Sequence, residues 1–126
     1  MNKVALKKRE DETYKQYHIP GCHNYMRRPK NSVYLNPSNS LEHELAKARV
    51  CYELQKEKKK FITEAVENAT GLRRDVVCLD DGEIFEIETT IARAKRFIGQ
   101  PVNIVAVGWD LNDPKWVKLQ GEKNGS

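Results

Sequence analysis

The sequence lacks any long apolar run. Hydrophobic residues make up 39% of its 126 residues and charged residues 32%. No stretch approaches the roughly 20 apolar residues that a membrane-spanning helix needs. The first residues also lack the apolar core of a signal peptide, because charge begins at Lys3 and Lys7. We therefore expect an intracellular, cytoplasmic protein that makes no contact with membranes.

Cysteine is scarce as well. Cys22, Cys51 and Cys78 are far apart in the sequence and odd in number, which makes a poor disulfide framework. No C-x-x-C pair suggests zinc, and the spacing of His18, Cys22 and His23 fits no common zinc pattern. The three cysteines are interpreted as ordinary reduced thiols.

Positive charge is concentrated at the start of the chain. Residues 1–40 carry eight Lys or Arg against three Asp or Glu, a balance of +5, and residues 41–126 carry fourteen against fifteen, a balance of −1. We interpret residues 1–37 as a partly ordered basic arm with one short helix near residues 7–17. Its tyrosines, interleaved with cations, either stack on nucleic-acid bases or pack the arm onto the domain. The arm itself is either a contact for a polyanion or a solvated tail.

The remainder predicts one α/β domain over residues 38–120, with a flexible tail over 121–126. Cap residues and apolar periodicity predict a helix over 41–57, with Leu41, Leu45, Ala48 and Tyr52 facing the core. Strands are predicted over 61–66, 75–79, 83–89 and 102–107, and a second helix over 90–98. The order α-β-β-β-α-β predicts a mixed four-stranded sheet flanked by helices, in which the last two strands are parallel.

One predicted hairpin carries the candidate chemistry. A two-residue Asp81-Gly82 turn would pair Val77 with Glu86 and Asp75 with Glu88. Opposed residues share a face of a sheet, and so do residues two apart in a strand. Asp75, Glu86 and Glu88 are therefore expected on one side, with Phe85 and Ile87 pointing into the core.

Three carboxylates this close repel one another, and a divalent cation would neutralise them. Glu44, at the edge of the first helix's apolar stripe, is expected to point towards the sheet and join them. Glu64 is either a fourth carboxylate or a surface acid. The alternative for the whole cluster is a solvated outer face of the sheet.

These residues resemble the PD-(D/E)xK, or restriction-endonuclease-like, nuclease superfamily. The resemblance rests on Glu44 in a helix, Asp75 at a strand start and Glu86-Ile87-Glu88 after a short turn. The chain is most similar in these features to small archaeal, viral or mobile-element members of the family. It implies that Asp75, Glu86 and the carbonyl of Ile87 hold Mg²⁺ or Mn²⁺, with Glu44 as an outer or second-metal ligand. Glu88 stands where the family usually has lysine, an E-x-E variant, and Lys95 is a candidate replacement.

The expected function is metal-dependent cleavage of DNA, with RNA left open. Small members of this fold often act as dimers, which would suit a two-stranded or branched substrate. The rivals are a catalytically degenerate DNA-binding module and a protein that binds no nucleic acid. Basic residues on the arm, before the second strand and on the second predicted helix are the expected nucleic-acid contacts: Arg27, Arg28, Arg73, Arg74, Arg93 and Arg96.

Overall fold

The computed structural model describes residues 2–22, 26–89, 95–97, 99–106 and 117–119, with backbone alone for Lys95 and residues 117–119. The elements are α1 (Lys3–Tyr14), β1 (Tyr17–His18), α2 (Leu41–Lys56), β2 (Phe61–Glu67), β3 (Arg73–Cys78), β4 (Ile84–Glu88), the 3-10 helix η1 (Lys95–Phe97), β5 (Asn103–Ala106) and β6 (Val117–Leu119). This is a mixed α/β fold. In the part of the chain described, no helix is both long and apolar enough to cross a membrane.

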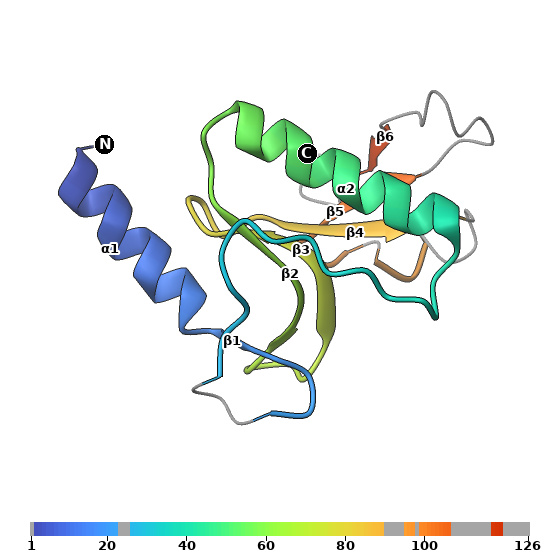
Figure 1. Cartoon of the computed structure of the whole chain (residues 1–126), viewed down its shortest axis with the longest axis horizontal. Coiled ribbons are helices and arrows are strands. Elements are labelled where there is room, and N and C mark those ends of the chain that lie inside the picture. Colours follow the sequence, from blue (N-terminus) through green and yellow to red (C-terminus); the bar gives the residue numbers. More distant parts are fainter. Residues whose placement is uncertain (1, 23–25, 90–94, 98, 107–116, 120–126) are drawn as a thin grey trace.

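One mixed sheet contains six strands in the order of the sequence, and α2 lies across it (Figure 1). Neighbouring strands are antiparallel, except that β4 and β5 run parallel. The predicted parallel pair is thus confirmed, and so are the two predicted strands before it, β2 and β3. The sheet is wider than the predicted four strands, because β1 and β6 add an edge on each side. The second predicted helix, over 90–98, lies largely outside the described residues, which include η1.

Helix α2 has the predicted bounds but the opposite face inward. The Ser40 side chain caps its start by accepting a hydrogen bond from the His43 N–H at 3.1 Å. Leu41 and Leu45, predicted to be core residues, are 67% and 45% exposed. The buried residues of α2 are Glu44, Ala46, Lys47, Val50, Cys51 and Leu54. Because two of them are charged, the distribution of apolar residues along the sequence does not predict which face is buried.

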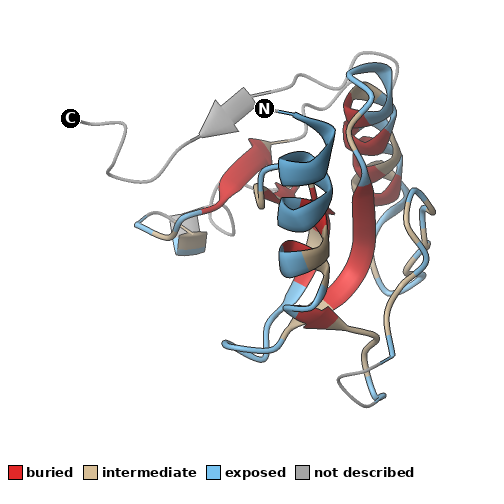
Figure 2. Cartoon of the chain, turned by 90° about the vertical axis from the view of Figure 1, so that its left-hand side faces the viewer, coloured by how far each residue is buried: buried red, intermediate tan, exposed pale blue. Residues whose placement is uncertain are grey.

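The sheet buries apolar side chains on both faces. Four apolar residues of α2 pack on one face against strand residues that include Val76, Ile87 and Phe85. The other face carries a second cluster of Tyr17, Ile62, Ala65, Val77, Leu79, Ile84, Val102 and Ile104, with Tyr14 and Phe97 packed beside it. Figure 2 shows the buried positions concentrated in the strands and α2, whereas α1 is mostly exposed. Phe85 and Ile87 therefore point into the core under α2, as predicted.

The β3–β4 hairpin has a longer loop than predicted. Val77 pairs with Ile84 and Val76 with Phe85, which is a shift of two residues from the predicted register. Four residues, 79–82, form the loop, with Gly82 at φ 79°. The physical reason is that Leu79 is fully buried in the second cluster and does not continue the ladder. A shift of two keeps every side chain on its face, but it places Asp75 opposite Glu86 and not opposite Glu88.

The N-terminal segment is tied to the sheet. β1 pairs with β2, and Tyr17 is buried in the second core cluster. The Tyr14 hydroxyl donates a hydrogen bond to the carbonyl of Arg28, whose guanidinium lies 4.2 Å from the centre of the Tyr34 ring. These tyrosines pack the segment onto the domain, which is one of the two roles expected for them. Tyr25 lies outside the described residues.

Candidate functional site

Strands β3 and β4 separate at Asp75, and side chains replace the backbone ladder there. The ladder between the two strands ends at the pair of Val76 with Phe85. Beyond it, the Asp75 N–H donates to Glu86 Oε1 at 3.0 Å, and the Ile87 N–H donates to Asp75 Oδ2 at 2.8 Å. Each carboxylate thus accepts from the backbone of the other strand. This exchange holds Asp75 and Glu86 side by side at the opened end of the hairpin.

Helix α2 brings His43 and Glu44 to the same opening. His43 Nε2 lies 3.3 Å from Asp75 Oδ2, and His43 Nδ1 lies 2.8 Å from Glu44 Oε2. Glu44 Oε1 accepts from the Asn36 backbone N–H at 2.6 Å. The expectation that Glu44 points inward is confirmed, because Glu44 is 7% exposed. His43 links it to Asp75.

Lys47 is the buried counter-charge of this region. Its ammonium lies 2.6 Å from Glu44 Oε1, 3.1 Å from Glu64 Oε2 and 2.6 Å from the Tyr34 carbonyl. These three acceptors match its three donors, so full burial leaves no hydrogen unpaired. Glu64 is accordingly a buried partner of Lys47 and not a surface acid.

Glu64 also interrupts the alternation of side chains along β2. Its φ is 51°, a left-handed conformation that is uncommon for residues other than glycine. Ile62 and Ala65 consequently lie in the same core cluster, although strict alternation would place residues three apart on opposite faces. The irregularity turns Glu64 towards Lys47 on the α2 side of the sheet.

The environment shifts the titration of three groups at the opening. Burial, together with the negative charge of Asp75, raises the pKa of Glu86 to about 7. Burial alone would lower the pKa of His43, but its hydrogen bonds and charge interactions with Asp75 and Glu44 raise it to about 9. Burial would raise the pKa of Glu44, but Lys47, the Asn36 N–H and His43 lower it to about 2. At neutral pH, Glu86 is the group nearest to its own titration point.

The chain matches no known protein family, no curated protein sequence and no solved structure. The site must therefore be interpreted from its own geometry.

The predicted acids meet in a different arrangement from the expected cluster on one face. Glu86 and Glu88 follow the alternation of β4 and lie on the face opposite α2, where Glu88 pairs with Arg96 at 3.3 Å. Asp75 reaches across the strand opening to His43 on the α2 side. Among the described residues, no three His, Cys, Asp or Glu side chains form a group that could hold a metal ion. Asp75 and Glu86 are the pair that the structure brings together.

The predicted nucleic-acid contacts have unequal surroundings. Arg74 is buried between Glu67 and Glu86, at 3.0 and 3.1 Å. Arg27 donates to the carbonyls of Tyr14 and Lys15 near the end of α1, and Arg28 donates to the carbonyl of Glu64. Arg73 and Arg96 have the most exposed side chains of the described candidates, at 50% and 62%. Arg93 and the side chain of Lys95 lie outside the described residues.

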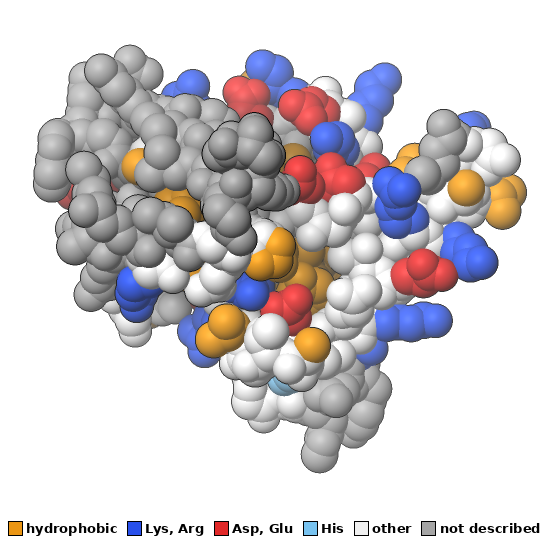
Figure 3. All heavy atoms as spheres, turned by 180° about the vertical axis from the view of Figure 1, so that it is seen from behind, with side chains coloured by type: hydrophobic (Ala, Val, Ile, Leu, Met, Phe, Trp, Pro, Cys, Tyr) orange, Lys and Arg blue, Asp and Glu red, His pale blue; other side chains and the backbone are white. Residues whose placement is uncertain are grey.

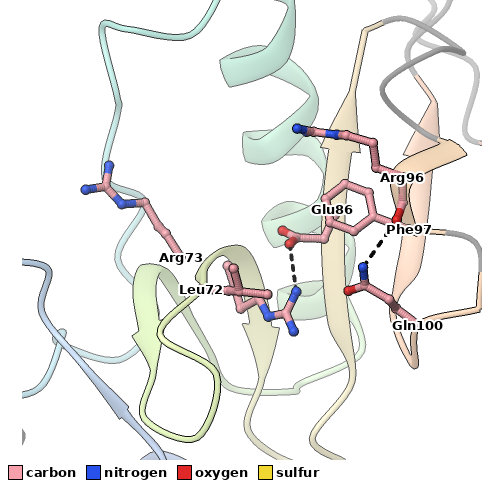
Figure 4. A pocket seen from close by; sticks show the side chains of 7 residues that line it. Leu72, Arg73, Glu86, Arg96, Phe97 and Gln100 are labelled. Atoms are coloured by element: carbon pink, nitrogen blue, oxygen red, sulfur yellow. Dashed lines mark hydrogen bonds and ion pairs between the residues drawn. The ribbon is translucent and has the colours of Figure 1, made fainter.

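A pocket opens on the face opposite α2, directly beside the carboxylates. It measures about 330 Å³ and is lined by Leu72, Arg73, Arg74, Glu86, Arg96, Phe97 and Gln100. Figure 4 shows Leu72 on one side of Glu86 and Phe97, Arg96 and Gln100 on the other, with α2 behind the strands. Glu86 therefore belongs both to the strand opening and to this pocket.

Sequence reasoning missed His43, Lys47 and the pocket residues Phe97 and Gln100. The side chain of His43 is 12% exposed and lies between the carboxylates of Glu44 and Asp75. The available signal was position: His43 and Lys47 are four residues apart, flanking Glu44 on the same turn of the helix. For Phe97 and Gln100 no local motif points to a pocket, because the pocket is made by residues brought together only in the folded sheet.

Proposed function

We propose that this protein is a metal-dependent phosphodiesterase acting on nucleic acid, built on a restriction-endonuclease-like arrangement of α2 and β2–β5. The observation that carries the proposal is a pair of hydrogen bonds where β3 and β4 separate. In them, the carboxylates of Asp75 and Glu86 each accept from the backbone of the other strand. Regular strands need no such device. The helix facing this opening supplies His43 and Glu44 to it, so groups from three elements converge.

The residues present suit a hard divalent cation such as Mg²⁺ or Mn²⁺. Such ions are commonly bound through one or two carboxylates, with water completing the coordination. Asp75 Oδ1 receives no hydrogen bond from the described residues, and burial and the charge of Asp75 raise the pKa of the adjacent Glu86, an effect that a bound cation would offset. Asp75, Glu86 and the Ile87 carbonyl would hold the ion. It would supply charge for the scissile phosphate and lower the pKa of an attacking water.

The chain's own groups would then position the substrate. His43, held between Glu44 and Asp75, keeps a positive charge within reach of an incoming phosphate oxygen at neutral pH. Arg73 and Arg96 provide exposed guanidinium groups on either side of Glu86. Glu88, paired with Arg96, occupies the position of the usual lysine, so a local cation there would have to come from another residue.

The test is a cleavage assay on plasmid and single-stranded substrates, DNA and RNA, with Mg²⁺ or Mn²⁺. Asp75→Asn keeps an oxygen to accept from the Ile87 N–H but removes the charge, so we expect it to abolish cleavage while the melting temperature stays close to that of the parent. Glu42→Ala, an acid on the first turn of the same helix as Glu44, is the matched control and should cleave normally. Unchanged cleavage by Asp75→Asn would exclude the mechanism.

A second candidate is a binding module without catalysis. The observation that favours it is that each acid of the site already has a cationic partner: Lys47 for Glu44, His43 for Asp75, Arg74 for Glu86 and Arg96 for Glu88. These cations neutralise the acids without any metal. This candidate predicts a gel shift in EDTA, no cleavage with either metal, and no rise in melting temperature when metal is added.

A further inference from the structure

The pocket opposite α2 combines apolar, aromatic and polar side chains. Leu72 and Phe97 supply apolar and aromatic walls on opposite sides, and the Gln100 amide and the Glu86 carboxyl supply polar atoms (Figure 4). Figure 3, which views the molecule from behind Figure 1, shows apolar atoms between basic and acidic side chains in the middle of that face. An apolar site with a few convergent polar groups is the usual form of a small-ligand pocket.

We propose that this pocket takes the base of one unpaired nucleotide of a single-stranded nucleic acid. The juxtaposition of an aromatic ring, an apolar wall and hydrogen-bonding side chains is what an unstacked base requires. Such bases are held by stacking on aromatic or apolar side chains and by hydrogen bonds to their edges. The Gln100 amide offers both a donor and an acceptor, which suits the edge of a base.

The size of the pocket limits the ligand. Its 330 Å³ lie at the lower end of the range for small-molecule sites, roughly 300–1,000 Å³. This space suits a single base with part of its sugar. Double-stranded nucleic acid could not enter without unpairing.

The rim of the pocket suits the backbone on either side of that nucleotide. Arg96 has a 62% exposed side chain and lies 5.4 Å from the centre of the Phe97 ring. Its contact with the largely buried Glu88, at 3.3 Å, leaves most of the Arg96 side chain exposed, where it can meet a phosphate. Arg73, on the other side of Glu86, has a half-exposed side chain and a longer contact of 3.6 Å with Glu64.

The pocket is continuous with the carboxylate site through Glu86. Glu86 Oε2 accepts from Arg74 at the pocket wall, and Glu86 Oε1 accepts from the Asp75 N–H at the strand opening. A base seated in the pocket would therefore place the adjoining phosphate near Asp75. This deepens the proposed function by naming its substrate as an unpaired strand, but binding in the pocket does not depend on cleavage.

The experiment measures binding in EDTA, so that it is independent of catalysis. A short single-stranded oligonucleotide carrying 2-aminopurine reports both affinity, by anisotropy, and stacking, by a change in fluorescence intensity. Phe97→Leu keeps apolar volume in the core but removes the ring. We expect it to weaken binding roughly 5- to 150-fold, the range for loss of one base–aromatic stack, and to abolish the intensity change. Leu72→Ser, at a 45% exposed position where the fold is not at risk, should weaken binding in the same direction.

Matched controls lie on the other side of the molecule. Tyr52→Ala removes an exposed aromatic ring of α2, and Arg49→Ala removes an exposed arginine of the same helix. Both should bind like the parent, whereas Arg96→Ala should bind more weakly and show a smaller dependence on salt.

Parental affinity in both Phe97→Leu and Leu72→Ser would overturn the proposal, and so would tighter binding to a fully paired duplex than to the single strand. Parallel oligodeoxynucleotide and oligoribonucleotide probes identify which nucleic acid is preferred. If these variants lose binding and the parent shows no metal-dependent cleavage, the proposed base-binding pocket is supported and the proposed nuclease function is rejected. Cleavage that is lost in Asp75→Asn but unaffected in Phe97→Leu, with unchanged binding, would do the reverse.

Discussion

At the scale of single residues, the site is a set of buried charges that are neutralised in pairs. Lys47 satisfies Glu44 and Glu64 together, and Arg74 satisfies Glu86 and Glu67. Breaking such pairs by removing one member is strongly destabilising, because the remaining charge stays buried without compensation. Glu86 is unusual among these acids, since burial and the neighbouring Asp75 make its ionised form unfavourable despite Arg74. A position of this kind gains from an added cation.

The pKa of Glu86 predicts how stability depends on pH without metal. The folded state holds this proton up to about pH 7, whereas the unfolded chain releases it near pH 4.5. Its contribution to stability is therefore fully present below about pH 4.5 and is lost as the pH rises to about 7, with each unit of pKa difference corresponding to about 1.4 kcal/mol. Urea unfolding of the parent and of Glu86→Gln in EDTA, between pH 4.5 and 8, checks this. The difference in unfolding free energy between the two should shift in favour of Glu86→Gln as the pH rises, and a constant difference would contradict it.

At the scale of elements, the sequence predicted where helices and strands lie better than how they face one another. The bounds of α2 and β2–β5 were predicted closely, because caps, alternation and apolar runs are local signals. The face of α2 was wrong, because Glu44 and Lys47 are buried as partners and Leu41 and Leu45 are not. The hairpin register was wrong by two residues, because burial of Leu79 lengthened the turn. Both errors come from tertiary contacts that a local pattern cannot reveal.

The orientation of α2 can be checked with two chemically identical substitutions. Leu54 is buried against the sheet at 6% exposure, and Leu45 is largely exposed. Leu54→Ala should lower the free energy of unfolding by about 2–5 kcal/mol, the usual range for a buried leucine. Leu45→Ala should change it by less than about 0.5 kcal/mol. Chemical denaturation measures both, and equal effects would show that the helix presents another face to the sheet.

At the scale of the whole molecule, the two faces of the sheet carry different features. One face is covered by α2, which contributes His43, Glu44 and Lys47 to the strand opening, and the other carries the pocket. The sequence indicated the acids of this region but not the pocket, since its lining comes from three separate segments. Helix α1 takes little part in either face, because residues 2–9 are exposed throughout.

Removal of residues 1–9 is therefore expected to leave the domain folded. The first buried residue of α1 is Glu10, whose carboxylate contacts Lys30 and Lys60, and this contact would be kept. We expect a melting temperature close to that of the parent and unchanged binding to a single strand in EDTA. Calorimetry and anisotropy provide the measurements. A large drop in melting temperature would mean that these residues support the fold, and weaker binding would mean that their lysines contact the nucleic acid.

The left-handed backbone at Glu64 has a consequence for which substitutions the chain can accept. Glycine would adopt this conformation without steric cost, so local backbone preference favours it. The same replacement would delete one of the three acceptors around the Lys47 ammonium, which has no route to solvent. The backbone conformation therefore favours glycine at position 64, whereas the buried charge of Lys47 requires glutamate there. A substitution of Glu64 would be tolerated only together with a second substitution, at Lys47, that removes the positive charge.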